Sequence, residues 1–169
     1  NNEIGNNLLE MATLLEMHEM VGSDESKFVD EKINKLKENA SETIDTLGKV
    51  FDQLPNAFSN EKQQLMQFAS KLDAPEDVRI NLFVREINRP LKRTNEESQL
   101  GIALFNTSIA FRSLANVIGE DPQKLEPYLR DALISHKKDP ETQMVLIHFF
   151  GRYDSNLADQ LKTEYELNP

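Results

Sequence analysis

Histidine side chains could act as metal ligands or as acid–base catalysts in this 169-residue chain, and methionine thioethers could bind a soft metal. The chain contains no cysteine. A di-iron helical bundle requires Glu three residues before each of two ligating histidines, and none of the three histidines has Glu at that position. The zinc-protease motif His-Glu-x-x-His begins at His18 but ends on Gly22. We therefore exclude thiolate, di-iron and zinc-protease chemistry, and we predict no catalytic residue, no metal and no cofactor.

Three methionines lie close together in the first predicted helix. Met17 and Met20 are three residues apart and are therefore neighbours on one helix face, and Met11 precedes them. Thioether groups beside His18 would suit Cu(I), but methionine more commonly builds an adaptable apolar surface. We interpret Met11, Met17 and Met20 as part of a surface that packs against a partner protein or the core.

One basic helix face contrasts with an otherwise acidic chain. The 19 Lys and Arg residues against 29 Asp and Glu give a net charge of −10, which disfavours binding to nucleic acid or to an anionic membrane. Arg85, Arg89 and Lys92 step by four and three, so they share a face, and Arg93 follows. Salt bridges within the chain or to a partner are the favoured role. The alternative is binding of an anionic phosphate or phospholipid headgroup.

The other two histidines occupy different predicted environments. His136 precedes Lys137 and Lys138 near a predicted helix C-terminus, where positive charge is favourable to the helix dipole. His148 lies inside an apolar run from Met144 to Phe150. We therefore predict that His148 is a hydrogen-bonded core residue rather than a catalytic base.

Helical periodicity recurs along the chain, and no segment shows the alternation of a strand. Pro and Gly fall where helices would begin or end, and Asp121 and Asp139 each precede a first-turn Pro. Pro127 is expected to restart a helix at Glu126. The sequence predicts an all-α bundle of six to eight helices. We expect one domain over 1–169, with a soft boundary near 55 between a hairpin or coiled-coil-like part and a bundle over 56–169.

The predicted long helix over about 26–54 has the most informative spacing. Its apolar residues step alternately by four and three, as in a coiled-coil seam, and they are Val29, Ile33, Leu36, Ala40, Thr43, Leu47, Val50 and Leu54. This stripe, widened by Ile44 and Phe51, exceeds what a compact domain needs. We therefore predict that a partner protein, or a second copy of the chain, contacts Ile33, Leu36, Leu47, Val50 and Phe51.

A second predicted helix, over about 96–118, is apolar on nearly all sides. Arg112 is its one charged residue between Ser98 and Gly119, and such a helix is normally buried. We predict that it is the central helix of the bundle and that Gly119 ends it. Gly101, inside the helix, suggests a close approach between helices.

The C-terminal part resembles one tetratricopeptide repeat in the order of its landmarks. These are Asp139-Pro140, a predicted helix, Gly151-Arg152-Tyr153, a second predicted helix, and Asn168-Pro169. The spacing from the first Pro to the last is shorter than the roughly 34-residue period of that family. No second copy precedes this one, and we transfer no function from the resemblance.

Function is predicted here mainly by elimination. The chain has no Gly-rich phosphate loop and no Gly-x-Ser-x-Gly turn. Two sustained apolar seams instead favour a non-enzymatic helical protein–protein interaction module, such as an adaptor, a chaperone-like factor, or an effector or secretion-associated domain. The alternatives are an anion binder through residues 79–93 and a carrier of a hydrophobic ligand between the 98–118 and 140–151 helices.

The expected compartment follows from the absence of a long apolar run. No segment approaches the roughly 18 apolar residues of a membrane span. We therefore expect a soluble protein, either cytoplasmic or exported, with no transmembrane segment. Contact with a membrane surface is not the favoured interaction, because the chain is acidic.

Overall fold

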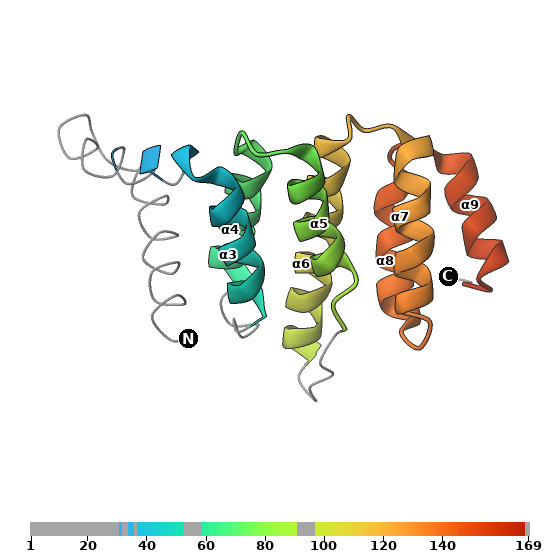
Figure 1. The fold of residues 1–169 in the computed structure, drawn as a ribbon. Helices are drawn as coiled ribbons and strands as arrows, with labels where there is room; N and C mark the ends of the chain where they lie inside the picture. Colours follow the sequence, from blue (N-terminus) through green and yellow to red (C-terminus); the bar gives the residue numbers. More distant parts are fainter. Residues whose placement is uncertain (1–30, 32–33, 36, 53–58, 91–96, 168–169) are drawn as a thin grey trace, which may run out of the picture. The chain divides into compact units, whose positions relative to one another are not determined.

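The computed structural model describes residues 31, 34–35, 37–52, 59–90 and 97–167 (Figure 1). Within these ranges the regular secondary structure consists of seven helices and no strand, so the predicted all-α multi-helix class is confirmed. The helices are α3 (Ala40–Phe51), α4 (Ser59–Lys71), α5 (Glu76–Ile87), α6 (Glu97–Val117), α7 (Pro122–Ser135), α8 (Pro140–Phe150) and α9 (Ser155–Glu164).

The chain divides into two compact units, which comprise residues 1–82 and 83–169. The predicted soft boundary near residue 55 lies inside the first unit. In that unit α3 packs against α4, and Phe51 and Leu65 are buried. The ammonium group of Lys62 lies 5.3 Å from the centre of the Phe51 ring. This contact brings the end of α3 and the start of α4 together.

The predicted long helix is interrupted at Asn39. Residues 31, 34, 35, 37 and 38 are helical, but Asn39 has φ −112° and ψ 45°, and α3 begins after it. The Asn39 side-chain amide donates a hydrogen bond to the Lys35 carbonyl oxygen at 3.1 Å. Asparagine side chains compete with regular helical hydrogen bonding in this way, so the apolar seam is divided at this residue.

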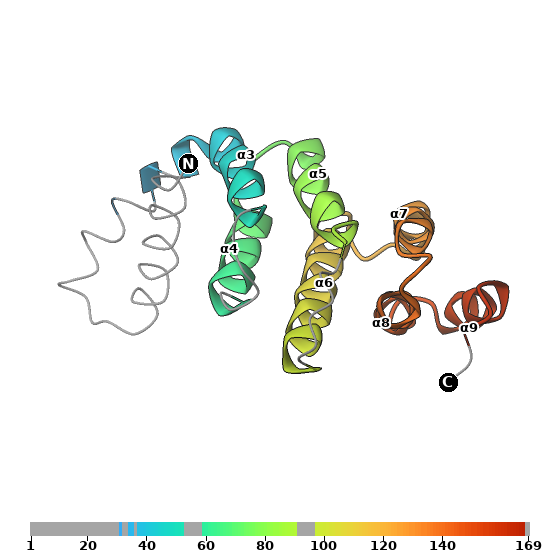
Figure 2. The same cartoon turned by 90° about the horizontal axis from the view of Figure 1, so that it is seen from below.

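In the second unit, α8 is the helix with the most neighbours. It packs against α6, α7 and α9, and Leu146, Ile147 and Phe150 on its inner face are fully buried. The connections between α6, α7, α8 and α9 are short, so α6 and α8 run in one direction and α7 and α9 in the other (Figures 1 and 2).

Burial along α6 confirms the prediction of a buried helix. Ala110, Phe111 and Leu114 are fully inaccessible to solvent, and the polar residues Thr107 and Ser108 are buried beside them. The helix forms its main contact with α8. The core of the second unit therefore lies between α6 and the inner face of α8.

Acidic caps start each of the last three helices. Asp121 accepts a hydrogen bond from the Gln123 amide at 2.9 Å, and Asp139 accepts one from the Thr142 amide at 3.4 Å. These two caps were predicted from the Asp-Pro pairs, because the Asp oxygen satisfies an amide that has no helical partner. Asp154 forms the third cap, on α9.

The prediction that Pro127 restarts a helix is wrong, because α7 continues through it from Pro122 to Ser135. A proline inside a helix removes the hydrogen bond to the carbonyl four residues earlier, here that of Gln123. Both residues are exposed. The lost bond therefore lies on the solvent side of α7, where the helix continues without burying an unsatisfied carbonyl.

Two glycines, Gly101 inside α6 and Gly119 two residues after its end, have different conformational requirements. Gly119 has φ +80°, and the Glu120 amide donates to the Ala115 carbonyl at 2.8 Å, as in a Schellman helix end. This confirms that Gly119 ends the helix. Gly101 is exposed, and in the described part of the chain no atom of another helix lies within 4 Å of the position of an added Cβ. The predicted close approach of helices at Gly101 is therefore wrong.

We expect the same substitution at these two glycines to change stability in opposite directions. Gly101→Ala should raise the free energy of unfolding by about 1 kcal/mol, because alanine is the better helix former and has space there. Gly119→Ala should lower it by about 1–2 kcal/mol, because the left-handed conformation is strained for alanine. Urea unfolding followed by far-ultraviolet circular dichroism measures both, and a change of the same sign in both variants would contradict the assignment.

Candidate binding surface

Three side chains are in contact on the outer side of α8 and in the turn that follows it, and they are His148, Phe149 and Arg152. The His148 and Phe149 rings meet edge to face, with centres 5.6 Å apart. The guanidinium carbon of Arg152 lies 4.7 Å from the centre of the Phe149 ring, within cation–π range. Phe149 is thus held by its two neighbours while remaining partly exposed.

The predicted burial of His148 is wrong, because this residue is exposed. The buried positions of α8 are Thr142, Gln143, Leu146, Ile147 and Phe150, a spacing that defines one helix face. His148 lies outside that stripe. An apolar run of residues does not reveal which side of its helix faces the core, and this is why the sequence misplaced His148.

Helix α6, which packs against α8, carries two exposed side chains of its own. Phe105 is 49% exposed, although most of the helix is buried. Arg112 is also exposed, and it lies seven residues further on, two turns along the same side. Because α6 packs against α8, we define the α6–α8 face as Phe105, Arg112, His148, Phe149 and Arg152.

The charges of both arginines of this face act on the ionisation of Tyr153. Burial raises the pKa of Tyr153 above its ordinary value of 10.0, and the charge of Glu120 raises it further. Arg112 and Arg152 both act in the opposite direction and lower this pKa. The ionisation of the Tyr153 phenol is therefore influenced by Arg112, which lies on α6, and by Arg152, which follows α8.

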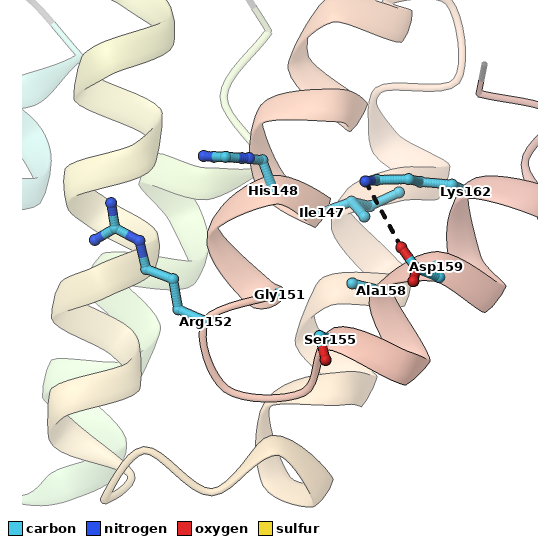
Figure 3. Close-up of a pocket in the computed structure, with 8 residues that line it drawn as sticks. All are labelled: Ile147, His148, Gly151, Arg152, Ser155, Ala158, Asp159 and Lys162. Atoms are coloured by element: carbon cyan, nitrogen blue, oxygen red, sulfur yellow. Dashed lines mark ion pairs between the residues drawn. The ribbon is translucent and has the colours of Figure 1, made fainter. Parts of the chain in front are cut away.

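A groove of about 310 Å³ lies on the other side of α8, where it meets α9. Ile147, Gly151 and Ala158 form its apolar part, and Ser155, Asp159 and Lys162 are the polar residues of α9 that line it. The Lys162 ammonium group extends over Ile147 and lies 3.9 Å from the Asp159 carboxylate (Figure 3). His148 and Arg152 also line the groove, but their side chains point away from α9 toward the side of α6 (Figure 3).

Three of the predicted partner-binding residues of the long helix are described by the structure, and all three are buried. Leu47, Val50 and Phe51 are at most 2% exposed, in the core of the first unit. Their heptad spacing therefore serves internal packing in the described fold, and their assignment to a partner contact stays a prediction that this burial does not favour. The other proposed partner residues lie outside the described part of the chain, and they are Met11, Met17, Met20, Ile33 and Leu36.

The predicted basic face is partly used within the chain. Arg89 forms two hydrogen bonds with the buried carboxylate of Glu86, at 2.5 and 3.3 Å. This geometry is the bidentate pairing that arginine favours, and it confirms an internal salt bridge. Arg85 is exposed, whereas Lys92 and Arg93 lie outside the described residues.

Two buried polar side chains fix the corner between α7 and α8. His136 ends α7, as predicted, but it is only 4% exposed, and its Nε2 atom lies 2.7 Å from the Ile87 carbonyl oxygen. The Gln143 amide donates to the Leu133 carbonyl at 2.8 Å. Sequence reasoning missed Gln143, because a polar residue early in a helix usually faces solvent.

The described part of the chain contains neither a group of side chains that could hold a metal ion nor a helix that could span a membrane. Among the described residues, no three His, Asp or Glu side chains are placed to share a metal ion. In the same part of the chain, no helix combines the length and the apolar character needed to cross a bilayer. The absence of an enzymatic activity stays a prediction.

Titration of Tyr153 tests how the α6–α8 face is arranged. In a Tyr128→Phe/Tyr165→Phe background, tyrosinate absorbance should report a Tyr153 pKa above 10.0, which Glu120→Gln lowers. Arg112→Gln and Arg152→Gln should each raise it, because each removes a positive charge that stabilises the phenolate. The matched variant Lys124→Gln should leave it unchanged. Equal titration of the parent and both arginine variants would contradict the arrangement.

The same shift has a consequence for stability at high pH. Because the pKa of Tyr153 is raised in the folded state, folding favours the protonated phenol. This contribution is complete below the unfolded-state pKa, about 10, and is lost as the pH rises through the folded-state value. Phenylalanine at this position should remove that part of the alkaline destabilisation, as measured by urea unfolding across the same pH range.

Comparison of the whole chain with protein-family profiles, with curated proteins and with solved structures gives no match.

Proposed function

We propose that this chain is a non-enzymatic protein-interaction module and that the α6–α8 face binds a segment of the partner. The observation that carries the proposal is the exposure of Phe105. This large apolar side chain is 49% exposed on a helix whose other described apolar residues are mostly buried. Exposed aromatic side chains beside arginine are the groups that most often dominate the energy of protein interfaces.

Phe149 supports the proposal because its ring already contacts two neighbouring side chains. The His148 ring contacts its edge and the Arg152 guanidinium covers its face. An aromatic side chain already held by such contacts loses little conformational entropy when a partner covers it. Together with Phe105, it gives the face two apolar contact points on neighbouring helices.

Gly101 is a second observation in favour of this surface. An exposed glycine inside a helix destabilises it by about 1 kcal/mol relative to alanine, and among the described residues no close neighbour of Gly101 requires a glycine there. It lies one turn before Phe105 on the same side of α6. A missing side chain there leaves one side of the Phe105 ring open to a partner.

The other candidate binding surfaces are already occupied by contacts within the chain. Leu47, Val50 and Phe51 are buried, so the apolar seam in α3 is already covered by the chain itself. Arg89 is engaged with Glu86. The groove between α8 and α9 contains a lysine that is paired with a carboxylate. These findings favour the α6–α8 face over the long helix, the basic helix face and a small-molecule pocket.

Peptide display on the full chain tests the proposal. Peptides enriched from a random library should bind the parent chain and should lose about 30-fold in affinity with Phe105→Asp, since loss of an interface anchor is worth about 2 kcal/mol or more. Fluorescence anisotropy with the synthetic peptides measures the affinity. Far-ultraviolet circular dichroism checks that the variant retains its helices.

Ile134 provides a matched control. It is the other large apolar side chain with high exposure in the described ranges, at 61%, and it lies on α7. Ile134→Asp introduces the same charge at an equally exposed apolar position and should change affinity less than twofold. Failure to enrich any peptide, or peptides that bind the Phe105→Asp variant as tightly as the parent, would overturn the proposal.

A further inference from the structure

Resting on the proposed function, we infer that the segment bound by the α6–α8 face is acidic, with carboxylates that contact Arg112 and Arg152 on either side of an apolar residue. The inference starts from the charge of this face. In a chain with a net charge of −10, the five residues that define the face include two arginines and one histidine, and the one acidic charge that acts on the same Tyr153 phenol as the two arginines is that of Glu120.

Neither arginine is neutralised by an ion pair within the described part of the chain. Arg112 is exposed and is the only basic residue of α6. Arg152 uses its guanidinium plane to cover Phe149. The Arg152 side chain points toward the side of α6, the helix that carries Arg112 (Figure 3), and both positive charges lower the pKa of Tyr153.

The guanidinium group of Arg152 favours one kind of binding group. Its central carbon lies 4.7 Å from the centre of the Phe149 ring, and the N–H groups of a guanidinium all lie in one plane. This planar fork matches a carboxylate in a bidentate arrangement. The Phe149 ring would at the same time offer an apolar surface to the neighbouring side chain of the partner. One charged and one apolar contact are therefore presented together.

The distribution of charge limits the partner to a segment rather than a large acidic surface. At about 0.1 M salt, charges more than roughly 10 Å apart are largely screened. Local charges at the face then determine the attraction, and the acidity of the rest of the chain has little influence. A broad acidic surface would also meet the charge of Glu120, which acts on the same Tyr153 as the two arginines, and would be repelled by it.

The composition of the peptides selected by display tests this inference. Peptides that depend on Phe105 should be enriched in Asp and Glu around an apolar residue. At physiological ionic strength, Arg112→Glu/Arg152→Glu should weaken their binding at least tenfold. A control with the same change in net charge, Lys124→Glu/Lys137→Glu, should alter it less than twofold, because both lysines are exposed on or next to α7.

Arg152→Lys separates the planar fork from the charge. It keeps the positive charge but should weaken binding severalfold, because an ammonium group cannot form the same bidentate contact. Wild-type affinity in this variant would overturn the assigned role of the guanidinium plane.

The remaining outcomes distinguish the two proposals. Peptides that require Phe105 but show no acidic bias, or that bind the double arginine variant normally, would overturn this inference and leave the proposed function standing. Peptides that bind independently of Phe105, or no enriched peptide, would overturn both.

Discussion

The position of α8 depends on two buried side chains that donate hydrogen bonds to carbonyl groups near helix ends. The last carbonyls of a helix have no partner within it, and burying them without donors would be costly. His136 reaches the Ile87 carbonyl at the end of α5, and Gln143 reaches the Leu133 carbonyl near the end of α7. With these groups satisfied, α8 can lie among α6, α7 and α9 and present Phe149 and Arg152 outward.

Short sequence motifs predicted the helix starts and ends, because these depend on interactions within a few residues. The Asp-Pro pairs located the starts of α7 and α8, because a capping carboxylate and a first-turn proline act within a few residues. Gly119 marked the end of α6, since a left-handed residue is needed there. The all-α class followed from helical periodicity along the chain. The burial of α6 followed from the nearly continuous apolar sequence of that helix.

The candidate site was not predictable in the same way, because it depends on which helix side each neighbour covers. His148 belongs to an apolar run, yet it lies outside the buried stripe of α8. The seam through Leu47 looked like a partner contact but packs in the core of its own unit. A periodic pattern identifies an apolar face and does not identify what covers it. Phe105 had no distinguishing local signal at all.

The hydrogen bond between His136 and Ile87 also bears on how the second unit folds. It joins residues 49 apart in sequence, whereas the successive helices α7, α8 and α9 are joined by short turns. Closing a long loop is slower and entropically less favourable than forming contacts between adjacent helices. The α7–α9 region therefore has the lower contact order and can assemble first. Attachment to the end of α5 then completes the corner, and this long-range link is a natural place for the first opening of the native state.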